Sequence, residues 1–146
     1  MTKQVPGPFT TNDIEDIKQA IMLAELDTSA EIHVHLEANC SGDCEVRAKE
    51  LFQELHLDKT VERNGILIYL SLKNKRFCIC ADTGIQTKVP DDFWVVIKQD
   101  FLNKIRNENF TDGLIEVIHH TGLQLKRLFP RKPGDINQLS DEVTFG

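Results

Sequence analysis

The chain has 146 residues, of which 40% are hydrophobic and 27% charged, and its formal net charge is −6. This size fits one domain that folds around its own core without a disulfide or a metal. The acidic balance disfavours nucleic acids and anionic membranes as partners, because both need a basic surface. We expect a cytoplasmic protein with four reduced cysteines, because the sequence shows no signal peptide and no apolar stretch near the roughly 20 residues of a membrane helix.

Seven helices and strands are predicted from the spacing of apolar residues. In chain order they are a helix over 12–26, a strand over 31–37, a helix over 44–57, strands over 65–72 and 76–82, and helices over 91–106 and 110–129. In the first helix, Ile14, Ile17 and Ile21 recur at helical spacing. The first strand alternates polar and apolar residues, which predicts a strand covered on one face. The second is apolar throughout, which is typical of a central strand covered on both faces.

This order of elements predicts one α/β domain on a small mixed sheet. The first two strands are joined by a helix and should therefore be parallel. The short polar turn at 73–75 brings the third strand back antiparallel to the second. The chain then divides into a lead at 1–9, the α/β domain at 10–130 and a polar tail at 131–146.

Polar residues from distant parts of the chain should meet at one rim of this sheet. The end of the third strand, Asp82, should lie beside Arg63 and Asn64, which precede the second strand. The first strand begins at the same rim with Glu31. If the first helix packs antiparallel to that strand, Glu25 at its end lies there too.

The rim is a candidate site for a divalent cation, because Ca²⁺ and Mg²⁺ prefer several oxygen ligands. Its candidate ligands are Glu25, Glu31, Asp82, Asp91 and Asp92. Arg63 would hold a phosphate or pair with one of the acids, and Asn64 and Gly84 complete the predicted cleft. The alternative is a surface salt-bridge network in which Asp91 caps the third helix.

Cysteines and histidines offer weaker candidates for a metal site. The four thiolates could bind zinc, but their C-x₃-C and C-x-C spacings fit no standard zinc knuckle, so we favour ordinary packing over zinc or a redox pair. These residues are Cys40, Cys44, Cys78 and Cys80. His33 and His35 share a strand face with Glu31, so a transition-metal site is conceivable, but the polar face of a sheet explains them equally well. No conventional nucleophile motif is present.

Several blocks of the sequence, in order, resemble the TPM domain family. The blocks are Ala24-Glu25 with Thr28-Ser29-Ala30-Glu31-Ile32; Lys59-Thr60 with Arg63-Asn64-Gly65-Ile66-Leu67-Ile68-Tyr69-Leu70; Ala81-Asp82-Thr83-Gly84-Ile85 with Val89-Pro90-Asp91-Asp92-Phe93-Trp94; and Phe110, Gly113-Leu114, Gly122 and Phe129-Pro130. The ending at 137–146 is similar to that of small, stand-alone bacterial members. The resemblance covers nearly the whole chain.

The resemblance implies a three-layer α/β/α sandwich on a small mixed sheet of three to four strands, with about four helices. The family includes thylakoid-lumen proteins of photosystem II repair and an accessory protein of acetylcholine receptors. Acid phosphatase activity and divalent-cation binding have been proposed for members. On this chain the cation site would fall near Glu31, Asp82 and the start of the helix at 91–106.

Two departures from the family pattern limit what transfers to this chain. Many relatives carry a signal peptide and a membrane anchor, and this sequence shows neither, so roles in the lumen or at a membrane are not expected. Cys44 stands where relatives often carry proline.

We therefore predict a domain that binds Ca²⁺ or Mg²⁺. If it is an enzyme, it is a metal-dependent phosphomonoester hydrolase with Asp82 and Arg63 as catalytic residues. The alternative is a non-enzymatic module that maintains a protein complex through a protein partner, with the tail as its docking segment.

Overall fold

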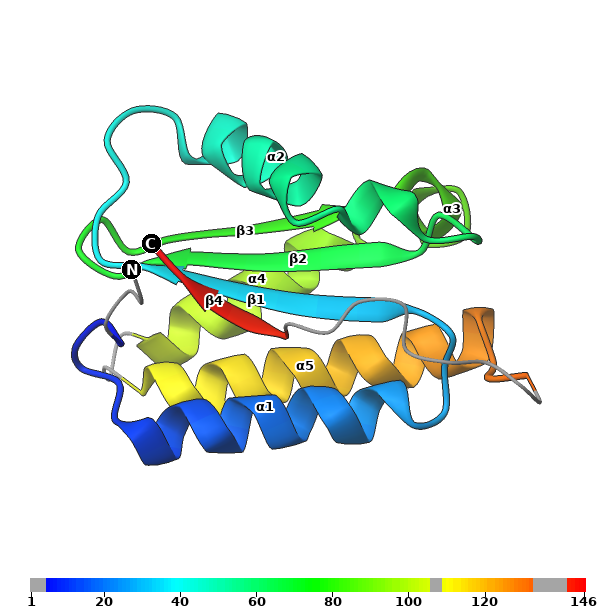
Figure 1. The fold of residues 1–146 in the computed structure, drawn as a ribbon, viewed down its shortest axis with the longest axis horizontal. Coiled ribbons are helices and arrows are strands. Elements are labelled where there is room, and N and C mark those ends of the chain that lie inside the picture. The colour runs from blue at the N-terminus through cyan, green and yellow to red at the C-terminus, as the bar shows by residue number, and fades with distance from the viewer. Residues whose placement is uncertain (1–4, 106–108, 133–141) are drawn as a thin grey trace.

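A mixed four-stranded sheet is the middle layer of the computed structural model, which describes residues 5–105, 109–132 and 142–146 (Figure 1). Its spatial order is β3-β2-β1-β4. The strands are β1 (Glu31–Glu37), β2 (Gly65–Ser71), β3 (Arg76–Ala81) and β4 (Val143–Phe145). β1 is parallel to β2 and to β4, and β3 is antiparallel to β2.

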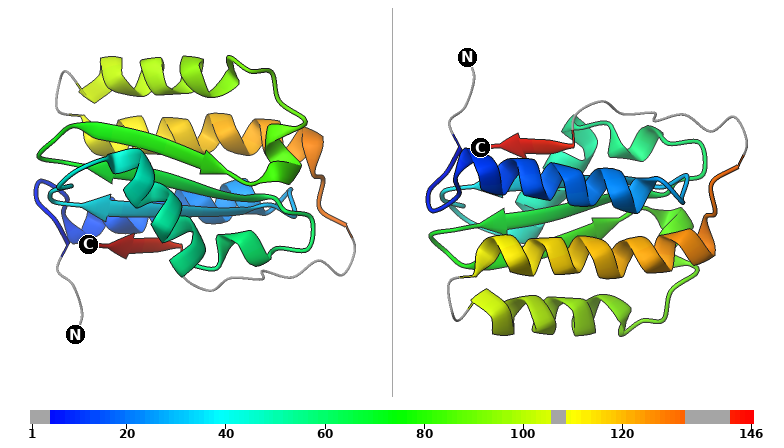
Figure 2. Two further views of the ribbon diagram at one scale, coloured as in Figure 1. Left: turned by 90° about the horizontal axis from the view of Figure 1, so that it is seen from above. Right: turned by 90° about the horizontal axis from the view of Figure 1, so that it is seen from below.

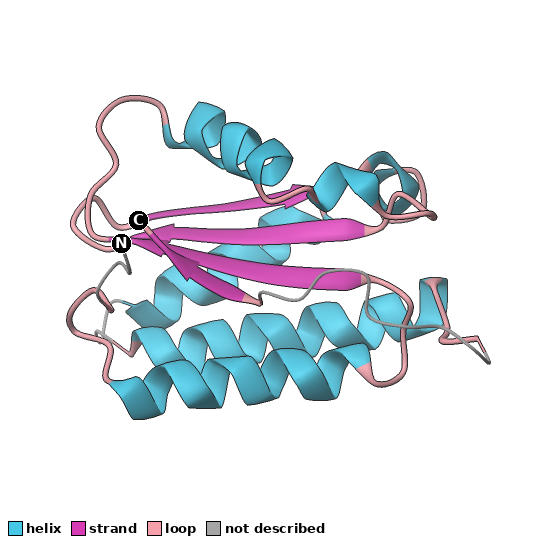
Figure 3. Cartoon of the chain, viewed as in Figure 1, coloured by secondary structure: helices cyan, strands magenta, loops and turns pink. Residues whose placement is uncertain are grey.

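Helices cover both faces of the sheet, as the colouring by secondary structure makes plain (Figure 3). One face is covered by α1 (Thr11–Glu25), α4 (Phe93–Ile105) and α5 (Phe110–Leu128), and the other by α2 (Cys44–Glu54). The short helices η1 (Leu57–Lys59) and α3 (Thr83–Gln86) lie at the end of the sheet where β1 and β2 begin. The predicted mixed sheet and three-layer arrangement are confirmed.

The alternating pattern of β1 assigns its two faces to different surroundings. Ile32, Val34 and Leu36 belong to the larger hydrophobic core, with α1 and α5. The intervening polar residues face the side of α2, where Leu67 and Tyr69 of β2 belong to a smaller core. All seven residues of β1 are buried, so the strand is covered on both faces and not on one.

The remaining differences from the predicted elements lie at short segments. The second helix ends at Glu54, because His56 has left-handed backbone angles (φ 60°). The third long helix begins at Phe93, and the end predicted for it at 106 lies outside the described residues. The sequence does not predict three short elements, which are α3, η1 and β4. In the predicted tail, residues 133–141 lie outside the described residues, and 143–145 form β4.

The described ranges contain no helix that is both long and apolar enough to cross a membrane.

Candidate functional site

Arg63 and Asp82 form a two-pronged ion pair at the end of the sheet. Arg63 donates from Nε to Asp82 Oδ2 at 2.7 Å and from Nη2 to Oδ1 at 2.9 Å. Asp82 is 5% exposed and also caps α3, since its Oδ1 accepts the backbone N–H of Thr83 at 2.7 Å. Burial disfavours the charged carboxylate, but these hydrogen bonds outweigh it and hold the pKa of Asp82 below its ordinary value.

The backbone around this pair explains its geometry. Arg63 has left-handed angles (φ 52°) in the turn that leads into β2, and its carbonyl accepts the N–H of Gly84 at 2.9 Å. A Cβ at Gly84 would collide with the carbonyl oxygens of Glu62 and Arg63. Glycine at position 84 therefore lets the start of α3 pack directly on the turn that carries Arg63.

A cavity of about 380 Å³ lies beside the ion pair, between α2 and the end of β3. Its polar lining includes Lys49, Gln53, Asp58, Arg63, Asp82, Thr83 and Gln86. Asp58 Oδ1 is buried and has no hydrogen-bond partner among the described residues. Its other oxygen, Oδ2, lies 3.9 Å from Lys59 Nζ, so this carboxylate is only loosely paired.

Asp58 is the one lining carboxylate that sequence reasoning missed. It lies in η1, a single turn too short to show any hydrophobic period. The available signal was its place in the same connection as Arg63, five residues upstream along the chain.

Asn64 lies at the predicted rim but serves a different contact. Its Nδ2 donates to Ser29 Oγ at 3.2 Å and to Glu62 Oε2 at 3.3 Å. Ser29 in turn donates to Glu62. These side chains join the turn before β1 to the turn before β2, which is a structural tie at the rim.

Glu25 and Glu31 form a second acidic group at the same end of the sheet. Glu25 is 6% exposed, and its Oε2 accepts the N–H of Ile32 at 2.8 Å. Burial is the largest cause that raises the pKa of Glu25, and the neighbouring carboxylates of Glu31 and Glu142 add to it. Together they raise this pKa to about 8, although the hydrogen bond from Ile32 opposes the shift. Glu31 pairs in register with Gly65, and the N–H of Asp82 donates to the carbonyl of Gly65. The backbones of Glu31 and Asp82 are thus separated by two strand spacings, or about 10 Å.

The five predicted cation ligands do not form one cluster. Asp91 and Asp92 are exposed in the turn before α4, so neither is buried at the rim. Among the described residues, no group of three or more His, Cys, Asp or Glu is placed to hold a metal ion. The same finding gives no support to a zinc site formed by the four cysteines.

The histidines of β1 take part in a buried hydrogen-bond network that joins β4 to the sheet. His33 Nε2 lies 2.8 Å and His35 Nδ1 2.6 Å from the hydroxyl of Thr144. His35 Nε2 also contacts Glu37, which accepts from Arg47 Nη2 at 2.7 Å and from the Tyr69 hydroxyl. Burial opposes the charge on Glu37, but the Arg47 and Tyr69 hydrogen bonds hold its pKa below the ordinary value.

Comparison with known proteins gives a family and a fold. The model of the TPM domain matches residues 6–122. The BA42 protein of the psychrophilic bacterium Bizionia argentinensis, solved by NMR, is 36% identical over 98% of this chain and 99% of its own, with a TM-score of 0.89.

Two more distant solved structures share the fold alone. The N-terminal domain of the cg2496 protein from Corynebacterium glutamicum is 16% identical over 82% of this chain and 75% of its own, with a TM-score of 0.64. The N-terminal domain of a P. gingivalis protein is 20% identical over 84% and 76%, with a TM-score of 0.65. No curated protein matches the chain.

Proposed function

Because the chain belongs to the TPM domain family, we propose that it binds a divalent cation, Ca²⁺ or Mg²⁺, in the cavity beside Asp82. One observation carries the proposal: a carboxylate oxygen, Asp58 Oδ1, is buried beside this cavity with no partner in the described part of the chain. The side chain of Asp58 is 28% exposed, but a carboxylate oxygen buried without a partner is still costly, and an oxygen-seeking cation would offset that cost.

The residues present fit a hard cation with a partly hydrated shell. Asp58 and Asp82 supply carboxylate oxygens, and Gln53 and Gln86 supply amide oxygens from the lining. Mg²⁺ commonly uses one or two carboxylates and keeps several waters, whereas Ca²⁺ takes more oxygen ligands. Two carboxylates without a third therefore favour Mg²⁺, or a weakly held Ca²⁺. Glu25, Glu31, Asp91 and Asp92 stay predictions as direct ligands, since no described cluster contains them.

Phosphomonoester hydrolysis is the secondary clause of the proposal. A cation bound here would polarise a phosphoryl oxygen and lower the pKa of a bound water. The side chain of Arg63 is 53% exposed at the cavity, and two of its nitrogens donate to Asp82. Its third nitrogen, Nη1, and the Lys49 ammonium would hold phosphate oxygens on the cavity wall.

An NMR titration with Mg²⁺ and Ca²⁺ tests cation binding. We expect backbone amide shifts at 58–64 and 82–86, and a Kd raised at least about tenfold by Asp58→Asn and by Asp82→Asn. Asp112→Asn, an exposed change in the first turn of α5, is the matched control and should bind as the wild type does. Shifts confined to other parts of the chain, or equal affinity in all four proteins, would exclude this site.

Hydrolysis is tested separately with a generic phosphomonoester in the presence of Mg²⁺. We expect turnover to fall in Asp82→Asn and Arg63→Ala and to be unchanged in Asp112→Asn. Equal rates in all four preparations would show that the activity belongs to a contaminant. That result would remove the hydrolase clause without affecting the binding measurement.

A further inference from the structure

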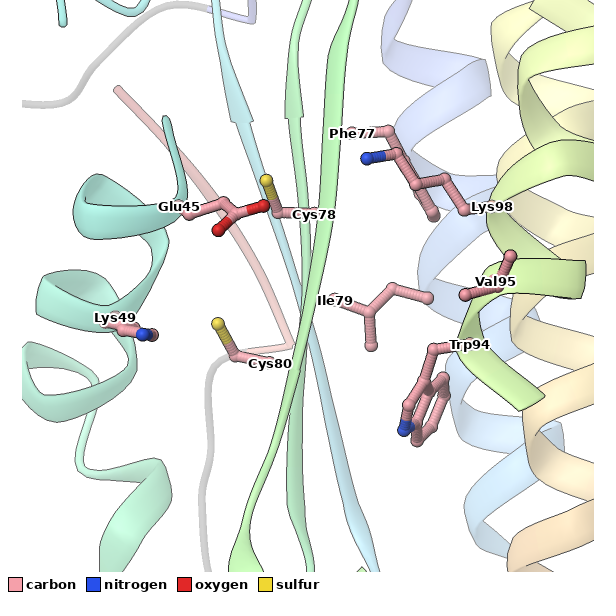
Figure 4. Close-up of a pocket in the computed structure, with 9 residues that line it drawn as sticks. All are labelled: Glu45, Lys49, Phe77, Cys78, Ile79, Cys80, Trp94, Val95 and Lys98. Atoms are coloured by element: carbon pink, nitrogen blue, oxygen red, sulfur yellow. The ribbon is translucent and has the colours of Figure 1, made fainter. Parts of the chain in front are cut away.

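A second cavity, of about 270 Å³, lies along the outer edge of β3 between α2 and α4 (Figure 4). It is lined by Glu45, Lys49, Phe77, Cys78, Ile79, Cys80, Trp94, Val95 and Lys98. Cys78 and Cys80 point toward α2, and Ile79 points toward α4 (Figure 4). We call this cavity the β3 groove. Its floor is the edge of the sheet, and it shares Lys49, Ile79 and Cys80 with the cavity beside Asp82, which it adjoins along β3.

The strand presents backbone hydrogen-bonding groups to this groove. The N–H of Asp82 donates to Gly65, so in this antiparallel ladder every second residue back along β3 bonds to β2. The groups of Phe77, Ile79 and Ala81 therefore point outward. Because β3 has no other strand beside it in the described ranges, those of Phe77 and Ile79 face the groove unpaired.

The open stretch is short because both of its ends are closed. At one end Gln86 Nε2 donates to the outward carbonyl of Ala81 at 2.6 Å. At the other end the chain turns away at Lys75, which has left-handed angles (φ 51°). An added strand would therefore pair over only a few residues, centred on Ile79.

The side chains around the edge define the chemistry of an occupant. On the α4 side, half-buried Trp94 and the 53% exposed Val95 offer an apolar surface. On the α2 side lie Lys49 and Glu45, and Lys98 adds a second ammonium from α4. Two lysines against one glutamate leave the groove basic, although the whole chain carries a net charge of −6.

We infer that the β3 groove binds an extended peptide segment of a partner protein by strand addition, with apolar residues toward Trp94 and Val95 on the α4 side and acidic residues toward Lys49 on the α2 side. Main-chain hydrogen bonds to Phe77 and Ile79 supply affinity, and alternate side chains supply specificity. The basic groove in an otherwise acidic protein selects acidic segments and repels basic ones.

A second copy of the chain fits the groove less well. Both views in Figure 2 show α4 lying beyond β3 at this side of the molecule. Edge-to-edge pairing of two copies would bring two α4 helices into the same layer under the joined strands. A single extended segment needs only the space along the edge of β3, between α2 and α4.

The test uses a blocked heptapeptide, Val-Asp-Val-Asp-Val-Asp-Val, titrated into ¹⁵N-labelled protein with a chelator present to remove divalent cations. We expect amide shifts at 76–80 and 94–98, and slower hydrogen exchange at the amides of Phe77 and Ile79. Lys49→Glu should weaken binding about three- to tenfold, because an attraction becomes a repulsion. Lys126→Glu, an exposed change on α5, should leave the affinity unchanged.

Two peptide controls separate strand addition from simple adhesion. A peptide with N-methylated backbone keeps the charge and side chains but loses the donors, so it should not bind. A lysine-for-aspartate peptide should bind only the Lys49→Glu protein. Binding of all three peptides alike, or no shifts at 76–80 with the first, would overturn the proposal. So would shifts at 76–80 that appear with protein concentration alone, which would indicate a second copy as the occupant.

Discussion

The guanidinium of Arg63, in the turn before β2, donates hydrogen bonds to both carboxylate oxygens of Asp82, at 2.7 and 2.9 Å. Asp82 has a further task, because its Oδ1 also caps α3. A cation bound in the adjoining cavity would compete with Arg63 for the same carboxylate. The ion pair and the proposed cation site are therefore coupled, and changes at either residue should be visible at the other.

The two tasks of Asp82 can be separated by substitution. Asparagine can still cap a helix but cannot pair with Arg63, whereas alanine does neither. We expect Asp82→Ala to lower the free energy of unfolding by about 1–2 kcal/mol, and Asp82→Asn to lower it by less. Urea denaturation measures both, with Asp91→Ala as an exposed control. Equal losses for the alanine and asparagine variants would show that the cap contributes nothing.

The buried carboxyl of Glu25 predicts a pH dependence of stability. Its pKa is raised from 4.5 to about 8, so between these pH values the folded state keeps a proton that the unfolded state has released. The free energy of unfolding should therefore fall as the pH rises from about 4.5 to 8.

Glu25→Gln removes this titration and keeps an oxygen that can accept the N–H of Ile32. The unfolding temperature should fall between pH 5 and pH 8, and this fall should be smaller for the variant than for the wild type. Parallel curves for the two proteins would assign the dependence to another group.

The hydroxyl of Thr144 should hold β4 to the sheet. Thr144→Val keeps the shape but removes the group that contacts both His33 and His35. We expect the free energy of unfolding to fall by roughly 1–3 kcal/mol, as for a broken buried hydrogen bond. The amide of Val34, which donates to Glu142, should exchange faster. Thr87→Val, at an exposed position, is the control, and equal exchange in the two variants would refute the role given to Thr144.

Gly84 should tolerate no side chain. In Gly84→Ala the new Cβ meets the carbonyls of Glu62 and Arg63, so the turn must shift and the Arg63–Asp82 pair must lengthen. We expect a destabilisation of about 1–3 kcal/mol and amide shifts at 62–64. Gly7→Ala, where an added Cβ meets nothing within 4 Å, should be nearly neutral. A neutral Gly84→Ala would mean that the turn is not closely packed.

The sequence predicts the neighbours of Asp82 because an antiparallel register fixes which residues face each other. Arg63 is brought beside Asp82 in this way. It does not reveal Asp58, because η1 is a single turn that has no period to detect. Nor does it reveal β4, since three residues carry too little pattern to show a pairing with a strand more than a hundred positions away. The five predicted acids form no metal-holding group among the described residues, because topology sets which end of the sheet a residue occupies but not where its side chain points.

Paramagnetic relaxation by Mn²⁺, which shares the oxygen preference of Mg²⁺ and Ca²⁺, tests the proposed cation site most directly. At substoichiometric Mn²⁺, the amides of Asp58, Arg63 and Thr83 should broaden first in the wild type, and this broadening should be lost in the Asp58→Asn and Asp82→Asn variants. The Asp112→Asn control should broaden as the wild type does. Broadening that centres on Glu25 and Glu31, or on Asp91 and Asp92, and persists in the Asp58→Asn and Asp82→Asn proteins would contradict the account.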